Sequence, residues 1–114
     1  MTEPLIQKTS GDVFDVLIFV QDREIGLIGE VDMATAPLLL AAASSFFGPP
    51  GGALTLDLSG VTFADSALLN VIEQITDRLN ADLLLINATA AVKRLFLAGG
   101  ATHLLRDISA VPVH

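Results

Sequence analysis

An amphipathic helix pattern between two short apolar segments constrains the fold of this chain more than any other feature. Four apolar positions recur at i, i+4, i+7 and i+11 on one helical face, namely Leu68, Ile72, Ile75 and Leu79. The segments on either side, Ala53–Leu58 and Asp82–Ile86, have the length and composition of strands. A helix that joins two strands in this way is a crossover between parallel strands, so we expect an α/β fold.

The rest of the chain extends this pattern at both ends. Two further strands are predicted at Val13–Val20 and Glu24–Glu30, joined by a turn into an antiparallel hairpin. Two further helices are predicted over Ala34–Phe47 and Thr89–Ala98, and the pattern leaves the type of a short last element, Ala101–Ile108, undecided. We therefore expect a mixed, mostly parallel sheet with an antiparallel hairpin strand at its edge, packed by helices.

Length and charge narrow the class of protein. The 114 residues predict a single domain, with residues 1–12 and 109–114 as loosely ordered tails. Hydrophobic residues make up 52% of the chain, which excludes intrinsic disorder. The net charge of −7 argues against binding to nucleic acid or to an anionic membrane surface. The N-terminus lacks the pattern of a signal peptide, and no apolar run approaches the roughly 18 residues of a membrane span, so we expect a cytoplasmic protein without direct membrane insertion.

Residues for catalysis or metal binding are scarce. The chain has no cysteine and two histidines, His103 and His114, so we expect no metal site. It has neither a phosphate-binding loop motif nor the sequence setting of a hydrolase nucleophile, so we expect no cofactor, no catalytic residues and no enzymatic activity.

The chain from Leu56 to Asn70 carries the strongest functional signal. A strand is predicted to end at Leu58, a seven-residue loop follows, and Asp65 and Ser66 open the helix. One interpretation is helix capping, because Asp and Ser are favoured N-cap residues. The other interpretation is a phosphorylation switch. A phosphate on Ser66 would lie at the positive end of the helix dipole and would add charge to an acidic face.

Three motifs resemble the STAS domains, and most closely the anti-sigma factor antagonists. Gly29–Leu38 (GEVDMATAPL) is similar to the family pattern G-E-L-D-x-A-T-A-P-x-L. Leu56–Ser66 (LDLSGVTFADS) is similar to the signature D-L-S-G-V-x-F-x-D-S, which is the most specific of the three. Leu85–Gly99 is similar to V-N-x-S-x-x-V-R-R-x-L-x-x-x-G. The motifs occur in the right order and extend over most of the chain.

The resemblance implies a partner switch with Ser66 as the phosphoacceptor. In such a switch the unphosphorylated antagonist binds an anti-sigma factor that is also a serine kinase, and so frees a sigma factor for transcription. The kinase then phosphorylates the serine, the complex breaks, and a separate phosphatase resets it. The resemblance and the polar face of the helix together give the expected partner-binding residues: Asp32, Asp57, Asp65, Ser66, Ala67, Leu68, Asn70 and Glu73.

Two features keep alternatives open. The family usually has glycine where this chain has Leu68, whose side chain would be either part of the core or an obstacle to kinase docking. The helix over Ala34–Phe47 is apolar on most sides, so it is either well buried or a patch for a partner or a second copy in a homodimer. A non-switching STAS scaffold subunit of a cytosolic or lipid-transport complex is therefore the alternative function.

Overall fold

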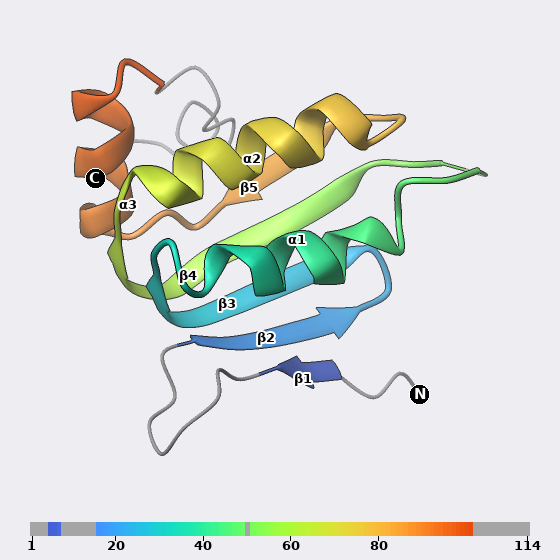
Figure 1. Cartoon of the computed structure of the whole chain (residues 1–114), viewed down its shortest axis with the longest axis horizontal. Coiled ribbons are helices and arrows are strands. Elements are labelled where there is room, and N and C mark those ends of the chain that lie inside the picture. Colours follow the sequence, from blue (N-terminus) through green and yellow to red (C-terminus); the bar gives the residue numbers. More distant parts are fainter. Residues whose placement is uncertain (1–4, 8–15, 50, 102–114) are drawn as a thin grey trace.

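A mixed sheet with helices packed against it forms the molecule (Figure 1). The computed structural model describes residues 5–7, 16–49 and 51–101, and within them five strands lie in chain order in one sheet. The elements are β1 (Leu5–Gln7), β2 (Val16–Gln21), β3 (Glu24–Val31), α1 (Ala36–Ser44), β4 (Leu54–Ala64), α2 (Ser66–Arg78), β5 (Leu83–Ile86) and α3 (Ala90–Ala98). Strands β1 to β3 pair antiparallel, whereas β3, β4 and β5 pair parallel. The predicted α/β fold with a mixed sheet that is antiparallel at one edge is confirmed.

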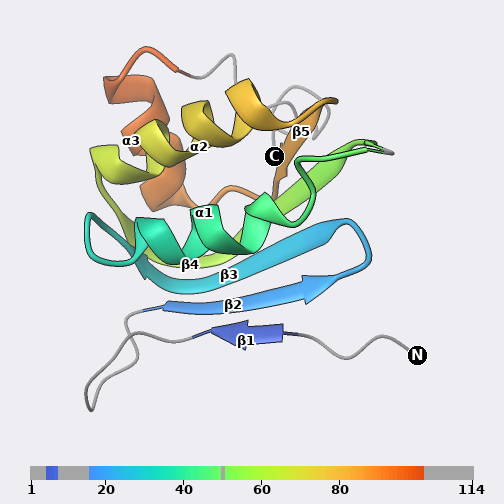
Figure 2. The same cartoon turned by 45° about the vertical axis from the view of Figure 1, so that its right-hand side comes forward.

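The helices cover one face of the sheet. Helices α1 and α2 lie side by side above the strands, and α3 packs against β4 near the end of the sheet where β4 leads into α2 (Figures 1 and 2). The predicted apolar stripe of α2 is buried over its whole length. On β4, the buried residues Leu54, Leu56 and Leu58 alternate with partly exposed ones, as expected for a strand with one face toward the helices.

Strand β4 is longer than the sequence analysis predicted. The strand continues to Ala64, so the predicted seven-residue loop after Leu58 is wrong. Its pairing with β3 shifts register twice, because β4 contributes one more residue than β3 between Asp57 and Gly60 and again between Val61 and Phe63. These β-bulges bend the strand without ending it. Consequently Asp65 alone separates β4 from α2.

The two ends of the chain also bear on the sequence predictions. Residues 5–7 form β1 beside β2, within the segment 1–12 that we expected to be a tail. No strand was expected there. The first residues of the predicted strand Val13–Val20, almost all of the undecided element Ala101–Ile108 and the tail 109–114 lie outside the described residues.

Arg23 joins the β2–β3 hairpin to the loop that precedes β4. Its guanidinium donates hydrogen bonds to the carbonyl oxygens of Ala53 (3.0 Å) and Gly52 (2.7 Å). The same group lies 5.0 Å from the ring centroid of Phe46, two residues after the end of α1, in a cation–π contact. The positive charge of Arg23 is therefore directed away from the hairpin and toward this loop.

Candidate partner-binding site

Ser66 is the first residue of α2 and is exposed to solvent. The preceding Asp65 caps the helix, because its Oδ1 accepts a hydrogen bond from the Ala67 backbone N–H at 2.8 Å. Capping is thus the role of Asp65. The Ser66 side chain forms no hydrogen bond with any other described residue. An accessible hydroxyl therefore stands next to a fixed carboxylate at the start of the helix.

Asp32 lies near this helix start because β3 and β4 end side by side. The Asp65 N–H donates to the carbonyl oxygen of Val31 at 3.2 Å, which places the residues that follow the two strands at one edge of the sheet. The Asp32 Oδ1 accepts hydrogen bonds from the backbone N–H groups of Ala34 (2.9 Å) and Thr35 (3.1 Å). Both aspartates are therefore held in place by backbone donors.

Thr35 fixes the turn between β3 and α1 from the inside. Its side chain is 1% exposed. The Thr35 Oγ1 donates a hydrogen bond to the Glu30 carbonyl oxygen at 2.9 Å and accepts one from the Asp32 N–H at 2.9 Å. Thr35 is the N-cap residue of α1, although its hydroxyl bonds to the turn instead of capping the helix.

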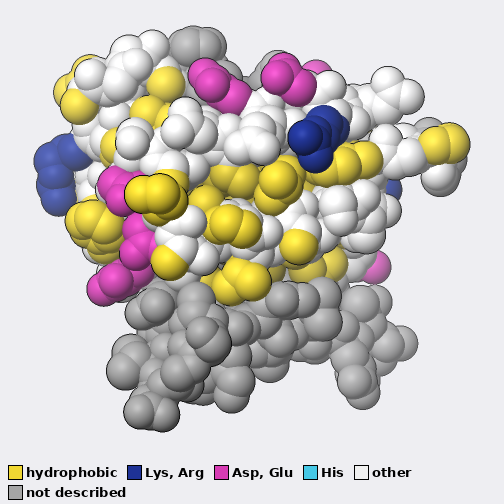
Figure 3. All heavy atoms as spheres, in the orientation of Figure 1, with side chains coloured by type: hydrophobic (Ala, Val, Ile, Leu, Met, Phe, Trp, Pro, Cys, Tyr) yellow, Lys and Arg dark blue, Asp and Glu magenta, His cyan; other side chains and the backbone are white. Residues whose placement is uncertain are grey.

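An apolar groove runs between α1 and α2 and ends near Ser66. It has a volume of about 280 Å³ and is lined by Met33, Ala36, Pro37, Leu40, Ala67, Asn70, Val71 and Gln74. Figure 3 shows hydrophobic side chains gathered along the line between the two helices and acidic side chains at the end of the sheet where β3 leads into α1. The Met33 side chain is 82% exposed at this end. Exposed apolar surface with a polar rim is typical of protein–protein interaction sites.

The expected partner-binding residues are only partly brought together. Ala67 and Asn70 line the groove, and Ser66 lies one helical turn before Asn70 on the same side of α2. Glu73 is exposed on α2, one turn beyond Asn70, and does not line the groove.

Leu68 points into the core. Its side chain is fully buried with Val71, Ile72 and Ile75 of the same helix. Of the two alternatives left open by the sequence, the core position is confirmed. The leucine that replaces the usual glycine of the family therefore does not obstruct the exposed side of the helix start.

Asp57 lies on the other face of the sheet. Its neighbours along β4, Leu56 and Leu58, are buried beneath the helices, and side chains alternate between the two faces of a strand. The Asp57 Oδ1 accepts hydrogen bonds from the Ser59 N–H (2.9 Å) and from Asn87 Nδ2 (3.3 Å). The structure thus separates Asp57 from Ser66 and the groove.

Sequence reasoning did not select most of the residues that line the groove. The six that it missed come from the turn before α1 and from both helices: Met33, Ala36, Pro37, Leu40, Val71 and Gln74. The sequence of α1 has an excess of apolar residues, and in the structure some of them are buried while others lie at the groove. Leu39, Ala42 and Ala43 are buried, whereas Leu40 is half-buried at the groove.

Residues 5–7, 16–49 and 51–101 contain no group of three His, Cys, Asp or Glu side chains that could hold a metal ion. No helix in this part of the chain is long and apolar enough to span a bilayer.

The chain is a small α/β domain with an apolar groove between two helices. The chain belongs to the STAS-domain family, because the family model described as "Mlab, STAS domain" matches residues 20–106. A comparison with curated proteins found no match.

Solved structures share this fold. An anti-sigma factor antagonist from Mycobacterium paratuberculosis is similar with a TM-score of 0.67 and 25% identity, over 80% of this chain and 81% of that protein. The anti-sigma factor antagonist SpoIIAA in its unphosphorylated form is similar with a TM-score of 0.65 and 14% identity, over 86% and 99% of the two chains. A likeness of fold alone extends to SLC26A9, with a TM-score of 0.51 and 17% identity, over 90% of this chain and 21% of that one.

Proposed function

We propose that this chain is an anti-sigma factor antagonist-like regulator that binds a protein partner through the α1–α2 groove and is released by phosphorylation of Ser66. The partner is an anti-sigma factor that is also a serine kinase, and its capture frees a sigma factor for transcription in a bacterial cytoplasm. The chain itself is a substrate of the kinase and not an enzyme. A separate phosphatase restores the unphosphorylated form.

The observation that carries this proposal is the exposed Ser66 hydroxyl at the end of the apolar groove. Asp65 provides the helix cap, so the hydroxyl is not needed to stabilise α2. A kinase docked on the groove would reach it directly. In the transfer, the γ-phosphoryl group of ATP joins Ser66 Oγ, the hydroxyl proton leaves, and ADP is released.

Phosphorylation would change the charge of this edge in a direction that breaks the complex. A phosphoserine carries roughly −1.5 to −2 charges at pH 7. Asp65 precedes it in the chain, and Asp32 lies at the end of the neighbouring strand. The backbone N–H of Ala67, which could otherwise stabilise the phosphate, already donates to Asp65. The added charge therefore repels carboxylates and disrupts an apolar contact at the groove.

A non-switching STAS scaffold is the second candidate function. The family model that matches the chain is described by the name Mlab and not by the antagonists, so membership of the family does not select between the two mechanisms. In the scaffold alternative, the groove binds a subunit of a cytosolic or lipid-transport complex permanently, and Ser66 is an ordinary surface residue.

A capture experiment with three forms of the full chain separates these candidates. The unmodified protein, Ser66→Glu and Ser66→Ala serve as baits in a lysate of the native host, and mass spectrometry identifies the captured proteins. We expect an ATP-binding kinase with the unmodified protein and Ser66→Ala, and at least about tenfold weaker binding by Ser66→Glu in calorimetry. Recovery of transporter subunits by all three baits equally would contradict the switch and support the scaffold.

A groove variant tests the docking surface separately from the charge at Ser66. Met33→Ser removes apolar surface from the groove at a position that is 82% exposed, so the fold is retained. We expect weaker binding of the same partner by Met33→Ser even when Ser66 is unmodified. Unchanged affinity would place the partner elsewhere on the molecule.

A further inference from the structure

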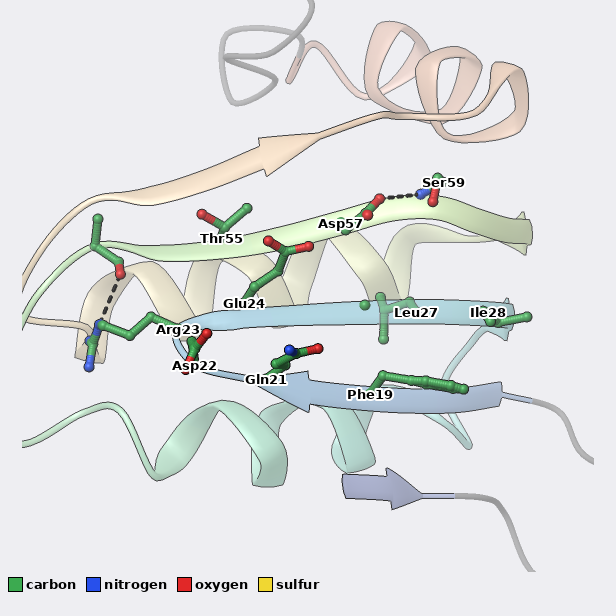
Figure 4. A pocket seen from close by; sticks show the side chains of 12 residues that line it. Phe19, Gln21, Asp22, Arg23, Glu24, Leu27, Ile28, Thr55, Asp57 and Ser59 are labelled. Carbon is green, nitrogen blue, oxygen red and sulfur yellow. Dashed lines mark hydrogen bonds between the residues drawn. The ribbon is translucent and has the colours of Figure 1, made fainter. Parts of the chain in front are cut away.

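A second concave site lies on the face of the sheet opposite α1 and α2. It is a hollow of about 650 Å³ formed by the β2–β3 hairpin and β4. Figure 4 shows side chains from the three strands around it, with the helices behind the sheet. Its lining includes the side chains of Phe19, Glu24, Ile28, Thr55 and Asp57, around the backbone of Gly26. None of these residues lines the α1–α2 groove.

Gly26 creates the hollow. The sheet register places it between Phe19 on β2 and Asp57 on β4, in one row across this face. An added Cβ at Gly26 would meet a single atom, the Phe19 Cβ at 4.0 Å, and the φ angle is not in the positive region that requires glycine. A glycine inside a strand weakens it, and neither crowding nor backbone conformation demands one here. The missing side chain leaves room for an occupant close to the backbone.

The polar groups in the hollow favour a cation. The Asp57 carboxylate is positioned by two hydrogen bonds to Oδ1, and its Oδ2 has no partner among the described residues. The exposed Glu24 lies one row away on β3, next to Thr55 of β4. Arg23 is the one cation in the described lining, and its guanidinium is bound to the carbonyl oxygens of Gly52 and Ala53. Among the described residues, the carboxylates of Asp57 and Glu24 therefore have no cationic partner in the hollow.

Two apolar side chains in the hollow indicate what else an occupant must contain. The Ile28 side chain is 47% exposed, and Phe19 forms the opposite wall on β2. A small molecule is normally enclosed by its pocket over most of its surface, which an open sheet face does not allow. An extended peptide instead presents every second side chain to the surface on which it lies.

We propose that this hollow binds an extended basic segment of a protein partner, which places an arginine or lysine against Asp57 and Glu24 and a neighbouring apolar side chain against Phe19 and Ile28. The site is distinct from the one that Ser66 controls. It gives the chain a second docking surface, so that one molecule can hold two proteins at the same time.

A synthetic peptide tests the proposal on the full chain. The probe has seven residues, with arginine and leucine alternating at every second position and serine between them, and the control probe has glutamate in place of arginine. We expect the basic probe to shift the amide NMR signals of Gly26, Ile28 and Asp57, and the acidic probe to shift none. No shifts with the basic probe, or shifts confined to Val71 and Gln74 of the groove, would overturn the proposal.

Variants localise the binding. Gly26→Val fills the hollow with a residue of high strand propensity, so it is expected to fold at least as well as the parent chain and to bind the basic probe at least about tenfold more weakly. The pair Glu24→Gln and Asp57→Asn removes the two charges and should weaken the probe by a similar factor. Asp77→Asn on α2, a matched loss of charge outside both sites, should leave its affinity unchanged. Equal binding by all these proteins would overturn the proposal.

Arginine amide alone distinguishes a small cation from a peptide. We expect it to bind at least about a hundredfold more weakly than the probe, because it cannot reach the apolar walls at the same time. Equal affinities would assign the hollow to a small cationic ligand and overturn the assignment of a protein segment.

Discussion

Leu68 occupies a position where a side chain can serve either the core or the surface. In α2 it lies one helical turn before Ile72 and packs beneath the helix with no exposed area. The glycine of the family motif would leave this space empty. Here the leucine adds to the core, and the exposed start of the helix is left to Ser66 and Asp65. The core of this domain and its candidate switch therefore use different residues of the same helix turn.

Replacing Leu68 with glycine tests this division. Leu68→Gly restores the residue of the family motif but removes a buried side chain and weakens the helix, so the free energy of unfolding should fall by about 3–5 kcal/mol. Asn70→Gly, at an exposed position of the same helix, should cost less than about 1 kcal/mol. Urea denaturation measures both. A Leu68→Gly protein as stable as Asn70→Gly would show that the leucine side chain is not part of the core.

Thr35 offers a second test at a single hydroxyl. Thr35→Val keeps the shape of the side chain but leaves the Glu30 carbonyl and the Asp32 N–H without their partner inside the turn. We expect a loss of about 1–3 kcal/mol in the free energy of unfolding. Thr35→Ser retains the hydroxyl and should recover most of this loss. If serine were no better than valine, packing of the methyl group, and not the hydrogen bonds, would hold the turn.

At the scale of elements, periodicity predicted each central strand and helix, and bulges limited the prediction of their ends. The α2 stripe and the alternation of Leu54, Leu56 and Leu58 are local sequence patterns, and the residues in both are buried in the fold. The extension of β4 to Ala64 depends on pairing with β3, which no local pattern records. Ser66 was therefore identified correctly as the helix start, while its direct junction with the strand was not.

The α1–α2 groove shows a second reason why the sequence alone could not predict the candidate site. A groove between helices depends on which side chains stop short of contact after packing, and the sequence shows only that both helices are partly apolar. Met33 follows directly after a motif residue, Asp32, yet its exposure could not be derived from spacing. For Asp57 the sequence left a choice between two faces. A side chain in a strand points to one face of the sheet or the other, and only the burial of Leu56 and Leu58 beneath the helices shows that Asp57 points to the opposite face.

Gly60 allows the bulged part of β4 to lie close to β3. A matched pair of glycine substitutions tests this role. An added Cβ at Gly60 would stand 2.6 Å from the Leu27 carbonyl oxygen and 2.7 Å from Ile28 Cγ1, so the strands would have to shift. Gly60→Ala should lower the free energy of unfolding by about 1–3 kcal/mol. Gly26→Ala, where the nearest atom is 4.0 Å away, should be neutral or stabilising by up to about 1 kcal/mol. Urea midpoints give the comparison, and equal losses at both positions would contradict the geometry of the bulge.

At the scale of the whole molecule, the sheet separates two surfaces of different chemistry. The helical face carries an apolar groove that ends at Ser66. The opposite face carries the hollow with its carboxylates. Strand β4 connects the two surfaces, because Thr55, Asp57 and Ser59 line the hollow and the strand leads through Asp65 into α2, which lines the groove. A single strand therefore positions two candidate sites without mixing their side chains.

This separation predicts that the two sites bind independently. Ser66→Glu adds a charge on the helical face, and exposed charges farther apart than a Debye length of about 8 Å are largely screened at physiological salt. Sites without shared contacts usually couple by less than about 0.5 kcal/mol. We therefore expect the basic peptide to bind Ser66→Glu and the parent chain with equal affinity, and Gly26→Val to leave capture of the groove partner unchanged.

Calorimetry on the parent chain, the two single variants and the double variant completes the cycle. Additive effects on both binding reactions would support two independent docking surfaces. A coupling free energy above about 1 kcal/mol between the two binding reactions would instead mean that both sites act on one shared element. That element would have two conformations, and binding at either site would favour one of them. The bulged segment of β4 is the candidate for that element, because it begins at the hollow with Asp57, packs closely against β3 at Gly60 and leads through Asp65 into α2. In that case a change at Ser66 would alter what the opposite face binds.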